Sequence, residues 1–257
     1  MNSKDFVGII MATLLAAMSA AAQTNFIKFQ SGPEQTALLE LYTSEGCSSC
    51  PPAEAWLSGL QESPGLWKDF APVGFHVDYW NHLGWKDVWS DPQFSERQRD
   101  YAQFWHSENI YTPEFVLNGK EWHHWFSGKN GPRAGGAKVG KLTLISKNTN
   151  RWEASFVPEH PQATPYEIHA ALLIGGTASD VKAGENNGRR LHHDFVAVNL
   201  LQMGLATTNG TAKGAFFFDT RQFRSAKTLS LVAWVTQAGQ IEPLQTAGGW
   251  LTAPAGK

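Results

Sequence analysis

The sequence predicts an α/β domain at the N-terminus, followed by a β-rich domain that is antiparallel and sandwich-like. Residues 37–79 form the pattern strand, helix, strand, which favours a parallel pair of strands with a right-handed crossover. Beyond a glycine-rich stretch at 128–140, short β-rich runs alternate with turn residues, and no clear helix lies between them. That second pattern is typical of an antiparallel sandwich.

Local patterns place the elements of the first domain. Residues 37–43 and 73–79 are short apolar runs that we expect to be buried strands. Residues 53–61 have helical character, and a second helix is expected over 91–107, where an Asp-Pro pair supplies an N-cap and a first helical residue. Residues 112–125 predict a hairpin, because an Asn-Gly pair separates two β-compatible runs.

Shifts in composition set the expected domain boundaries at 37–127 and 141–257, with 128–140 as a linker or exposed loop. The segment from 127 to 140 holds five glycines and one proline, which is typical of a loop. The β-rich runs of the second domain are 142–147, 152–157, 166–174, 195–201, 215–219 and 229–236. A chain of 257 residues is long enough for two modest domains.

Residues 1–22 are expected to be a signal peptide that is removed on export. Lys4 supplies a weakly positive start, an uncharged apolar run covers 6–18, and residues 20–22 are the small alanines that a signal peptidase reads. The alternative is a membrane anchor, but a run of about 13 residues is shorter than the roughly 20 that a spanning helix needs. The mature protein is therefore expected to be exported, periplasmic or secreted, with no stable membrane span.

The charge of the chain favours no electrostatic partner. The net charge is -2, and 17% of the residues are charged against 42% that are hydrophobic. Nucleic acids and anionic membranes are bound through strongly basic surfaces. Neither is therefore expected as a partner.

Cys47 and Cys50 are the only cysteines of the chain, and two serines separate them. A disulfide across so short a loop removes little entropy from the unfolded chain, which disfavours a purely structural role in a compartment where disulfides persist. A thiolate is the nucleophile in disulfide exchange, and free amide groups at a helix N-terminus stabilise it. We therefore expect Cys47 to be the exposed attacking thiol and Cys50 the resolving thiol. Pro51 and Pro52 lack an N–H group, which places the helix start near Cys50.

Two other interpretations of the pair stay open. A lone CxxC is also half of a zinc site, with His76, His82 or His106 as further ligands, although zinc sites commonly use a second CxxC or a histidine pair. The pair could also be purely structural. In the redox interpretation no resident metal and no bound cofactor are expected, because the cysteines themselves are the redox group.

Several stretches of the sequence resemble a known family. They are Glu40–Pro52, His76–Trp80, Leu83–Asp87, Gln98–Ala102, Tyr111–Pro113, Gly184–Arg189 and His193–Asp194. On these motifs the chain resembles the domain of unknown function 1223 family, whose members are exported bacterial proteins with a thioredoxin-like domain. The resemblance is close from residue 37 to about residue 125, and it implies a thioredoxin-like fold for the first domain.

The thioredoxin-like resemblance implies roles for further residues. It implies a cis peptide bond at Thr112–Pro113 opposite the cysteines, with the Thr112 backbone available to a peptide substrate. It also implies a buried acid on the strand before the pair. Glu40 lies on that strand, but it is one residue further from Cys47 than is usual, so a glutamate that faces elsewhere, at an exposed edge or in a salt bridge, is an equal alternative. The tryptophan that commonly precedes the first cysteine is replaced by Gly46, which leaves the site more open.

The expected function is thiol–disulfide oxidoreductase activity on a protein or small-molecule thiol or disulfide. The candidate catalytic residues are Cys47, Cys50, Thr112, Pro113 and Glu40. One alternative is a non-enzymatic binding protein that carries a passive disulfide, and another is a metal-binding protein that uses the reduced pair. His76 and Asp78, near the end of the second predicted strand, are a candidate proton relay or a structural pair.

Overall fold

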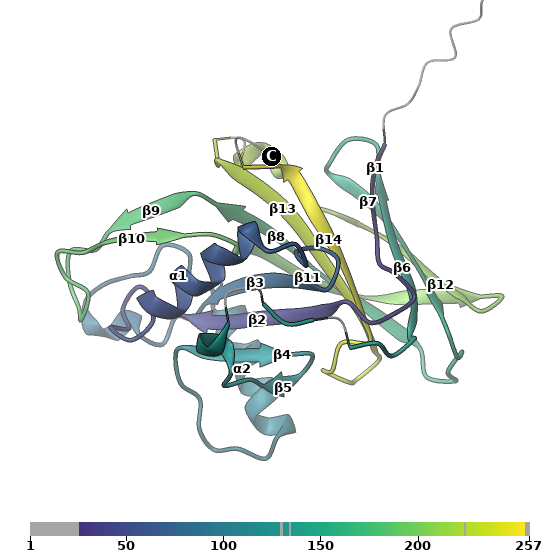
Figure 1. The fold of residues 1–257 in the computed structure, drawn as a ribbon, viewed down its shortest axis with the longest axis horizontal. Helices are drawn as coiled ribbons and strands as arrows, with labels where there is room; N and C mark the ends of the chain where they lie inside the picture. The colour runs from purple at the N-terminus through teal and green to yellow at the C-terminus, as the bar shows by residue number, and fades with distance from the viewer. Residues whose placement is uncertain (1–25, 129–130, 134, 224, 255–257) are drawn as a thin grey trace, which may run out of the picture.

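The computed structural model describes residues 26–128, 131–133, 135–223 and 225–254, and the expected signal peptide lies outside them. These residues form mostly β-structure with two α-helices (Figure 1). The helices are α1 (Pro51–Gly59) and α2 (Pro92–Phe104), with short 3-10 helices η1 (Leu60–Glu62), η2 (Asn81–Leu83), η3 (Trp125–Ser127) and η4 (Thr220–Phe223). The strands are β1 (Ile27–Gln30), β2 (Ala37–Thr43), β3 (Phe70–His76), β4 (Glu114–Leu117), β5 (Lys120–Glu121), β6 (Gly140–Ser146), β7 (Arg151–Pro158), β8 (Tyr166–Gly175), β9 (Thr177–Asp180), β10 (Arg190–His193), β11 (Val196–Thr208), β12 (Thr211–Phe217), β13 (Thr228–Gln237) and β14 (Gln245–Thr252).

One mixed sheet contains 12 of the strands, and β9 and β10 form a separate antiparallel pair. The main path runs β1–β6–β7–β12–β11–β3–β2–β4–β5. From β11 a branch leads through β8 and β13 to β14. The pairs β2–β3 and β3–β11 are parallel, and the other paired strands are antiparallel.

The fold class expected from the sequence is wrong. A thioredoxin-like α/β domain followed by a β-rich domain would place a separate sheet in each half of the chain. Instead β3 pairs with β11 at Gly74 and Val196, within the 12-stranded sheet. Gly74 donates its N–H to the carbonyl oxygen of Phe195 at 2.8 Å, and a Cβ at Gly74 would lie 3.4 Å from that oxygen. Local patterns carry no information about such a pairing between distant segments. The boundary at 128–140 stays a prediction.

Several local elements of the first half are confirmed. β2 spans the predicted residues 37–43, and α1 begins at Pro51 with Cys50 at its N-cap. Asp91 caps α2, where its carboxylate accepts the N–H of Gln93 at 2.9 Å. The Asn-Gly pair turns β4 into β5, with positive φ at both residues.

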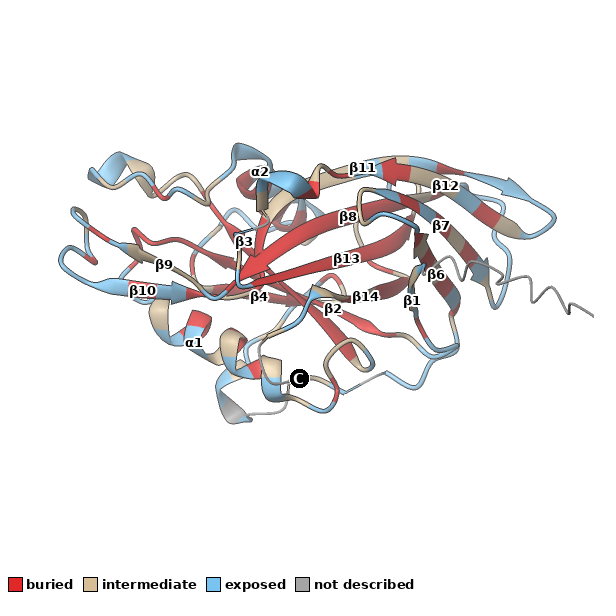
Figure 2. Cartoon of the chain, turned by 90° about the horizontal axis from the view of Figure 1, so that it is seen from above, coloured by how far each residue is buried: buried red, intermediate tan, exposed pale blue. Residues whose placement is uncertain are grey.

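Two hydrophobic clusters pack on the two faces of the central strands β8 and β13. Because alternate residues of a strand face opposite ways, Leu173 and Trp234 lie in the first cluster, with residues of β2, α1 and β3. Leu172 and Val235 lie in the second cluster, with residues of β6, β7 and β12. Figure 2 shows β8 and β13 as buried strands across the middle of the molecule. The first cluster combines residues from both halves of the sequence, so burial around the cysteines depends on the second half.

The two helices cover opposite sides of the strands that carry the cysteine loop (Figure 2). Along β2, Glu40 contacts Arg97 of α2, whereas Thr43 contacts Glu54 of α1. This follows from the alternation of side chains along a strand. It decides which residues of β2 can meet the cysteines, because α1 follows directly from Cys50.

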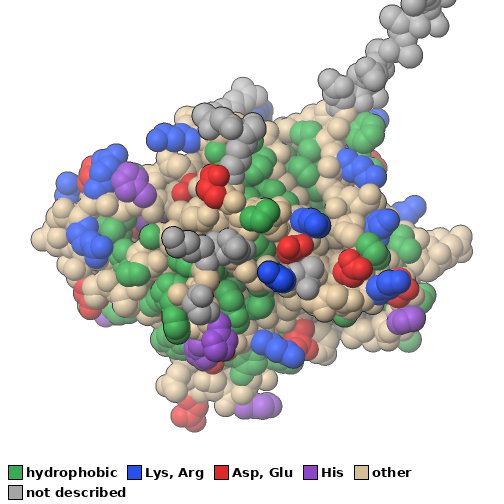
Figure 3. Space-filling view, viewed as in Figure 1, with side chains coloured by type: hydrophobic (Ala, Val, Ile, Leu, Met, Phe, Trp, Pro, Cys, Tyr) green, Lys and Arg blue, Asp and Glu red, His purple; other side chains and the backbone are tan. Residues whose placement is uncertain are grey.

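The surface carries both signs of charge. On the face shown in Figure 3, Lys and Arg side chains are interspersed with Asp and Glu, as the net charge of -2 leads one to expect. Among the described residues, no helix is long and apolar enough to cross a membrane.

Candidate functional site

Cys47 and Cys50 lie in the loop between β2 and α1, and both are free thiols. Ser48 and Ser49 are exposed, whereas Cys47 is 1% exposed and Cys50 is fully buried. The expectation that Cys47 is exposed is therefore wrong. Its sulfur lies 3.2 Å from the Ser49 hydroxyl and donates to the carbonyl oxygen of Thr112 at 3.6 Å. A substrate reaches this sulfur only when the loop moves.

Hydrogen bonding and burial give the two cysteine thiols different pKa values. The hydrogen bond from the Cys50 thiol lowers the pKa of Cys47 to about 6; burial opposes this shift, and the Ser49 hydroxyl and amide add to it. Burial raises the pKa of Cys50 well above its ordinary value, and the neighbouring Cys47 raises it further. The lowered pKa favours the thiolate at Cys47, and the raised pKa favours the protonated thiol at Cys50. Loss of the proton from Cys47 also removes its hydrogen bond to the Thr112 carbonyl.

The cis peptide bond expected at Thr112–Pro113 is present and lies next to the cysteines. The Thr112 carbonyl accepts a hydrogen bond from the Ser49 hydroxyl at 3.4 Å in addition to the one from Cys47. The Thr112 hydroxyl accepts the indole N–H of Trp80 at 2.8 Å. The structure thus brings Cys47, Cys50 and the Thr112–Pro113 bond together, as the sequence predicted.

A loop from the second half of the chain holds the cysteine loop in place. Asn186 is fully buried, and its amide donates to the carbonyl oxygens of Glu45 at 2.9 Å and Cys47 at 2.8 Å. The Glu185 carboxylate accepts the N–H of Ser48 at 2.9 Å. This loop therefore belongs to the site, although Asn186 follows Cys47 by 139 residues.

Behind Cys50 lies a buried chain of polar contacts. Thr43 is a neighbour that lowers the pKa of Cys50, and it donates its hydroxyl to Oε1 of Glu54 at 2.5 Å. The other oxygen of Glu54 pairs with Nδ1 of His193, and Nε2 of His193 lies 3.1 Å from a carboxylate oxygen of Glu45. All of these residues are buried, and none is more than 6% exposed.

His76 and Asp87 complete this arrangement. Nδ1 of His76 lies 2.7 Å from Oδ2 of Asp87, and the same oxygen accepts the N–H of Glu45 at 2.9 Å. The rings of His76 and His193 meet edge to face with centroids 5.1 Å apart. We call Glu45, Glu54, His76, Asp87 and His193 the acid–imidazole cluster. His76 is thus paired with Asp87 and not with Asp78, whose carboxylate instead accepts the Ser95 hydroxyl at 2.5 Å.

Mutual pairing determines the protonation of the acid–imidazole cluster. Burial alone would raise the pKa of Glu54, but the hydrogen bond and charge of His193 outweigh it and lower that pKa. Burial alone would lower the pKa of His193, but the hydrogen bonds to Glu45 and Glu54 raise it to about 10. The cluster therefore holds charged partners in an interior without solvent.

Glu40 is not brought to the cysteines. Its carboxylate accepts two hydrogen bonds from Arg97, at 2.7 and 3.1 Å, one from Tyr42 at 2.9 Å and one from Tyr101 at 2.6 Å. The guanidinium of Arg97 in turn lies 4.8 Å from the centre of the Trp234 ring. All of these contacts are on the α2 side of β2, so the geometry does not support the proton-relay role that the resemblance implied.

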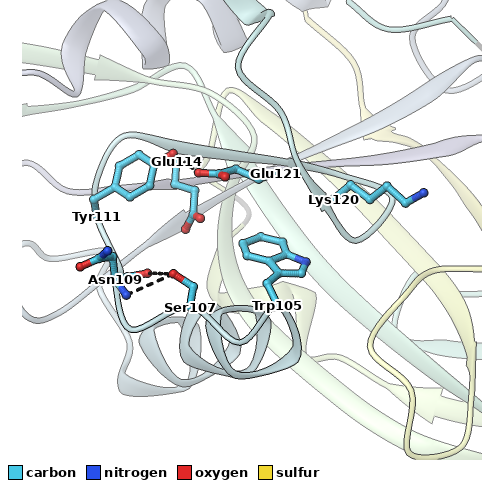
Figure 4. Close-up of a pocket in the computed structure, with 7 residues that line it drawn as sticks. All are labelled: Trp105, Ser107, Asn109, Tyr111, Glu114, Lys120 and Glu121. Carbon is cyan, nitrogen blue, oxygen red and sulfur yellow. Dashed lines mark hydrogen bonds between the residues drawn. The ribbon is translucent and has the colours of Figure 1, made fainter.

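A cavity of about 500 Å³ opens beside the strand that follows Pro113 (Figure 4). It is lined by Trp105, Ser107, Asn109, Tyr111, Glu114, Lys120 and Glu121. Burial raises the pKa of Glu114 to about 7, although the amide of Gln98 donates to this carboxylate at 2.5 Å and opposes the shift. Glu114 is therefore a buried acid whose direct partner is neutral.

Sequence reasoning missed most of the polar residues around the pair. The missed residues are Glu45, Glu54, Asp87, Glu185 and Asn186. Glu45, Asp87, Glu185 and Asn186 lie in the stretches that carry the family resemblance, but no role was assigned to them. Glu54 lies outside those stretches, and its signal is an acidic residue one helical turn after Cys50 in a segment that packs on the core. Of the three histidines considered as ligands, His76 joins the cluster, while His82 and His106 are exposed.

Comparisons with known proteins place the chain in a group without an assigned activity. A sequence profile described as "Protein of unknown function (DUF1223)" matches residues 38–236. A crystal structure of a protein from Agrobacterium tumefaciens is similar, with a TM-score of 0.58 and 18% identity over 87% of this chain and 97% of that one. The structure of HBP35 of Porphyromonas gingivalis has a TM-score of 0.58 and 14% identity over 87% of this chain and 78% of that one. At such low identity these two structures show a shared fold and nothing more. No curated protein matches the sequence.

Proposed function

The chain belongs to the DUF1223 family of proteins of unknown function, and we propose that it is an exported thiol–disulfide oxidoreductase whose redox group is the pair Cys47 and Cys50. The observation that supports this most is the asymmetry of the pair. The pKa of Cys47 is lowered to about 6, whereas that of Cys50 is raised. Disulfide exchange needs one nucleophilic thiolate beside one thiol held in reserve.

In the reducing direction, the Cys47 thiolate attacks one sulfur of a substrate disulfide. A bond forms between Cys47 and that sulfur, the substrate S–S bond breaks, and the leaving thiolate takes a proton from solvent. Cys50 then attacks the sulfur of Cys47, and its proton passes to the second substrate sulfur as that sulfur leaves. This closes the Cys47–Cys50 disulfide and releases the second substrate thiol, so two electrons have passed to the substrate. The oxidising direction is the reverse.

Access to Cys47 is the step that the fold controls. Because Cys47 is 1% exposed, exchange requires the loop of Ser48 and Ser49 to move away from Thr112. Each hydrogen bond that holds the loop, including those from Asn186, contributes on the order of 1 kcal/mol net. Opening the loop therefore costs a few kcal/mol, and it frees the Thr112 carbonyl to accept from the backbone of an extended substrate.

The reduction potential of the pair, with insulin-reduction and ribonuclease-refolding assays, tests the proposal. We expect turnover by the wild type and none by Cys47→Ser. Cys50→Ser should trap a mixed disulfide with the substrate, because it lacks the resolving thiol. Ser58→Ala, on the same helix but distant from both sulfurs in sequence, is the control and should keep wild-type turnover.

A potential below about -300 mV, which is typical of inert structural disulfides, together with no turnover would contradict the proposal. That result would favour the second candidate, a binding protein with a passive disulfide. The burial of Cys47 is the observation that favours this candidate.

Export is proposed from the pattern of residues 1–22. Expression with this segment in a Gram-negative host should yield a periplasmic protein whose first residue is Gln23. N-terminal sequencing of the fractionated protein measures this directly. Recovery of the uncut chain from the membrane fraction would show that the segment is an anchor.

A further inference from the structure

Glu54, His76 and His193 come from α1, β3 and β10 and meet in the interior. One ligand atom from each residue lies within 4.8 Å of the other two, and all three residues are buried. Bonds from zinc to nitrogen and oxygen are about 2.0–2.2 Å long, so tetrahedral ligand atoms lie about 3.3 Å apart. Modest rotations of these side chains would close them around an ion. We propose that Glu54, His76 and His193 bind a divalent transition-metal ion of the zinc class.

Carboxylates hold the far ring nitrogen of both histidines. Asp87 lies 2.7 Å from Nδ1 of His76, which leaves Nε2 for the ion, and Glu45 lies 3.1 Å from Nε2 of His193, which leaves Nδ1. A carboxylate on the far nitrogen is the arrangement that orients imidazoles in metal sites and fixes their tautomer. Two histidines, each oriented in this way, together with one glutamate form a ligand set that zinc uses in proteins.

The two orienting carboxylates are themselves fixed by the surrounding chain. Asp87 accepts the N–H of Glu45 at 2.9 Å and the N–H of Trp89 at 2.9 Å. The indole of Trp85 donates to the second oxygen of Glu45 at 2.7 Å. Such support keeps the ligands near one geometry before an ion arrives, which is what a precise metal site requires.

The charge of the acid–imidazole cluster also fits a dication. Glu45, Glu54 and Asp87 are three buried carboxylates, and buried negative charge needs nearby positive charge. A divalent ion with two neutral imidazoles supplies the same positive charge as two imidazolium rings. The ion would insert between Nδ1 of His193 and the Glu54 oxygen, which pair directly in the structure.

A cavity of about 510 Å³ between α1 and β10 gives a route to this position. Glu54 is among its lining residues, together with Pro51, Pro52 and Arg189. The proposed ligands include neither cysteine. The site is therefore different from metal binding by the reduced pair, and it does not rest on the redox function proposed above.

Titration of Co²⁺ into a chelator-treated Cys47→Ala/Cys50→Ala variant tests the proposal. We expect uptake of one ion per chain, ligand-field absorption without a thiolate charge-transfer band, and displacement of Co²⁺ by Zn²⁺. Added Zn²⁺ should raise the melting temperature, because an ion bound only to the folded state stabilises it. X-ray absorption on the Zn²⁺ form should count two imidazole ligands.

Matched variants locate the ion. Glu54→Gln and His76→Gln should weaken Zn²⁺ binding by more than tenfold, and the positioning variant Asp87→Asn by about tenfold. His160→Gln, which changes an exposed histidine outside this cavity, should bind as tightly as its parent. Circular dichroism checks that each variant is folded, and if the ligand variants do not fold, the imidazole count in the X-ray absorption spectrum decides.

Three results would overturn the proposal. They are no uptake by the folded double-alanine variant, uptake that Glu54→Gln and His76→Gln leave unchanged, and a spectrum without two imidazole ligands. Because that variant has no thiols, none of these results bears on the redox proposal. Loss of insulin reduction in Cys47→Ser likewise says nothing about the ion.

Discussion

Glu40 and Glu54 are buried carboxylates on opposite sides of β2, and their partners differ in kind. Glu40 faces α2 and pairs with the guanidinium of Arg97; burial would lower the pKa of Arg97, but Glu40 raises it far above the usual range. Glu54 faces α1 and pairs with the imidazole of His193, a group that can exchange its proton for a metal ion. The comparison teaches that a permanent cation fixes a buried carboxylate in a structural role. An imidazole partner instead leaves the carboxylate able to take part in proton exchange or metal binding.

Breaking the Glu40 side should have the largest effect on stability. Arg97→Met leaves Glu40 buried without its cation, so we expect the free energy of unfolding to fall by about 3–5 kcal/mol. Urea denaturation measures it. The double variant Glu40→Gln/Arg97→Met removes the stranded charge and should recover a large part of the loss. A fall in the free energy of unfolding of less than about 1 kcal/mol in Arg97→Met is the size expected of a surface pair. It would show that Glu40 does not depend on Arg97 for the stability of its buried charge.

Glu114 sharpens the comparison, because it is a buried carboxylate whose direct partner is the neutral amide of Gln98. Its folded-state pKa of about 7 lies above the ordinary 4.5, and the nearby Glu121 and Glu40 add to the effect of burial. A raised pKa contributes stability that is fully present below the unfolded pKa and is lost as pH rises through the folded pKa. Glu114→Gln should remove this loss, so the variant should gain up to about 3 kcal/mol on the wild type between pH 4.5 and about 8.

Denaturation of wild type and Glu114→Gln at several pH values checks this prediction. Glu108→Gln is the control variant, since Glu108 is exposed and is not among the groups that shift the pKa of Glu114. A difference between wild type and Glu114→Gln that does not change with pH would contradict the raised pKa of Glu114.

Releasing the cysteine loop should have an intermediate effect. Asn186→Ala removes the donors to the carbonyl oxygens of Glu45 and Cys47, which should cost about 1–2 kcal/mol of stability. If the substitution destabilises mainly the closed loop relative to the open loop, alkylation of Cys47 by iodoacetamide should become up to about tenfold faster. Asn187→Ala, which changes an exposed neighbour, should label at the wild-type rate. Equal rates in all three proteins would mean that Asn186 does not control access.

The smallest expected effect is on the acidity of Cys47. The alkylation rate of the wild type should show a midpoint near pH 6, against about 8.5 for an ordinary thiol. Ser49→Ala removes one hydroxyl donor but keeps the Ser49 amide, so the midpoint should rise by less than about one unit. A wild-type midpoint near 8.5 would remove the main support for Cys47 as the nucleophile.

The sequence carries local information about the fold and little about its long-range pairing. The helix start near Cys50, the Asp91 cap and the Asn-Gly turn were predictable because each depends on neighbouring residues. The joining of β3 to β11 at Gly74 was not, because its partner at Phe195 lies in the other half of the chain. That pairing joins strands from both halves of the chain in one sheet.

The site divides in the same way. The cysteine pair and the Thr112–Pro113 bond were found from motifs. Motifs also contain four members of the acid–imidazole cluster, Glu45, His76, Asp87 and His193, but they did not predict that these residues meet. The members come from five separate elements and loops, and a pairing such as His193 with Glu54 spans 139 residues. Glu40 was chosen because it lies on the strand before the pair. Its side chain faces α2 and not the cysteines, because successive side chains of a strand point to opposite faces.

The clamp by Asn186 has a consequence for synthesis of the chain. A polypeptide that has been made only as far as β7 contains both cysteines but lacks Glu185, Asn186 and His193. Such a chain lacks the contacts that hold the loop closed over Cys47, so a fragment ending at residue 158 should be alkylated faster than the complete protein. The loop over Cys47 is thus closed late, after most of the protein has been made, and both thiols of a half-finished chain are open to reagents.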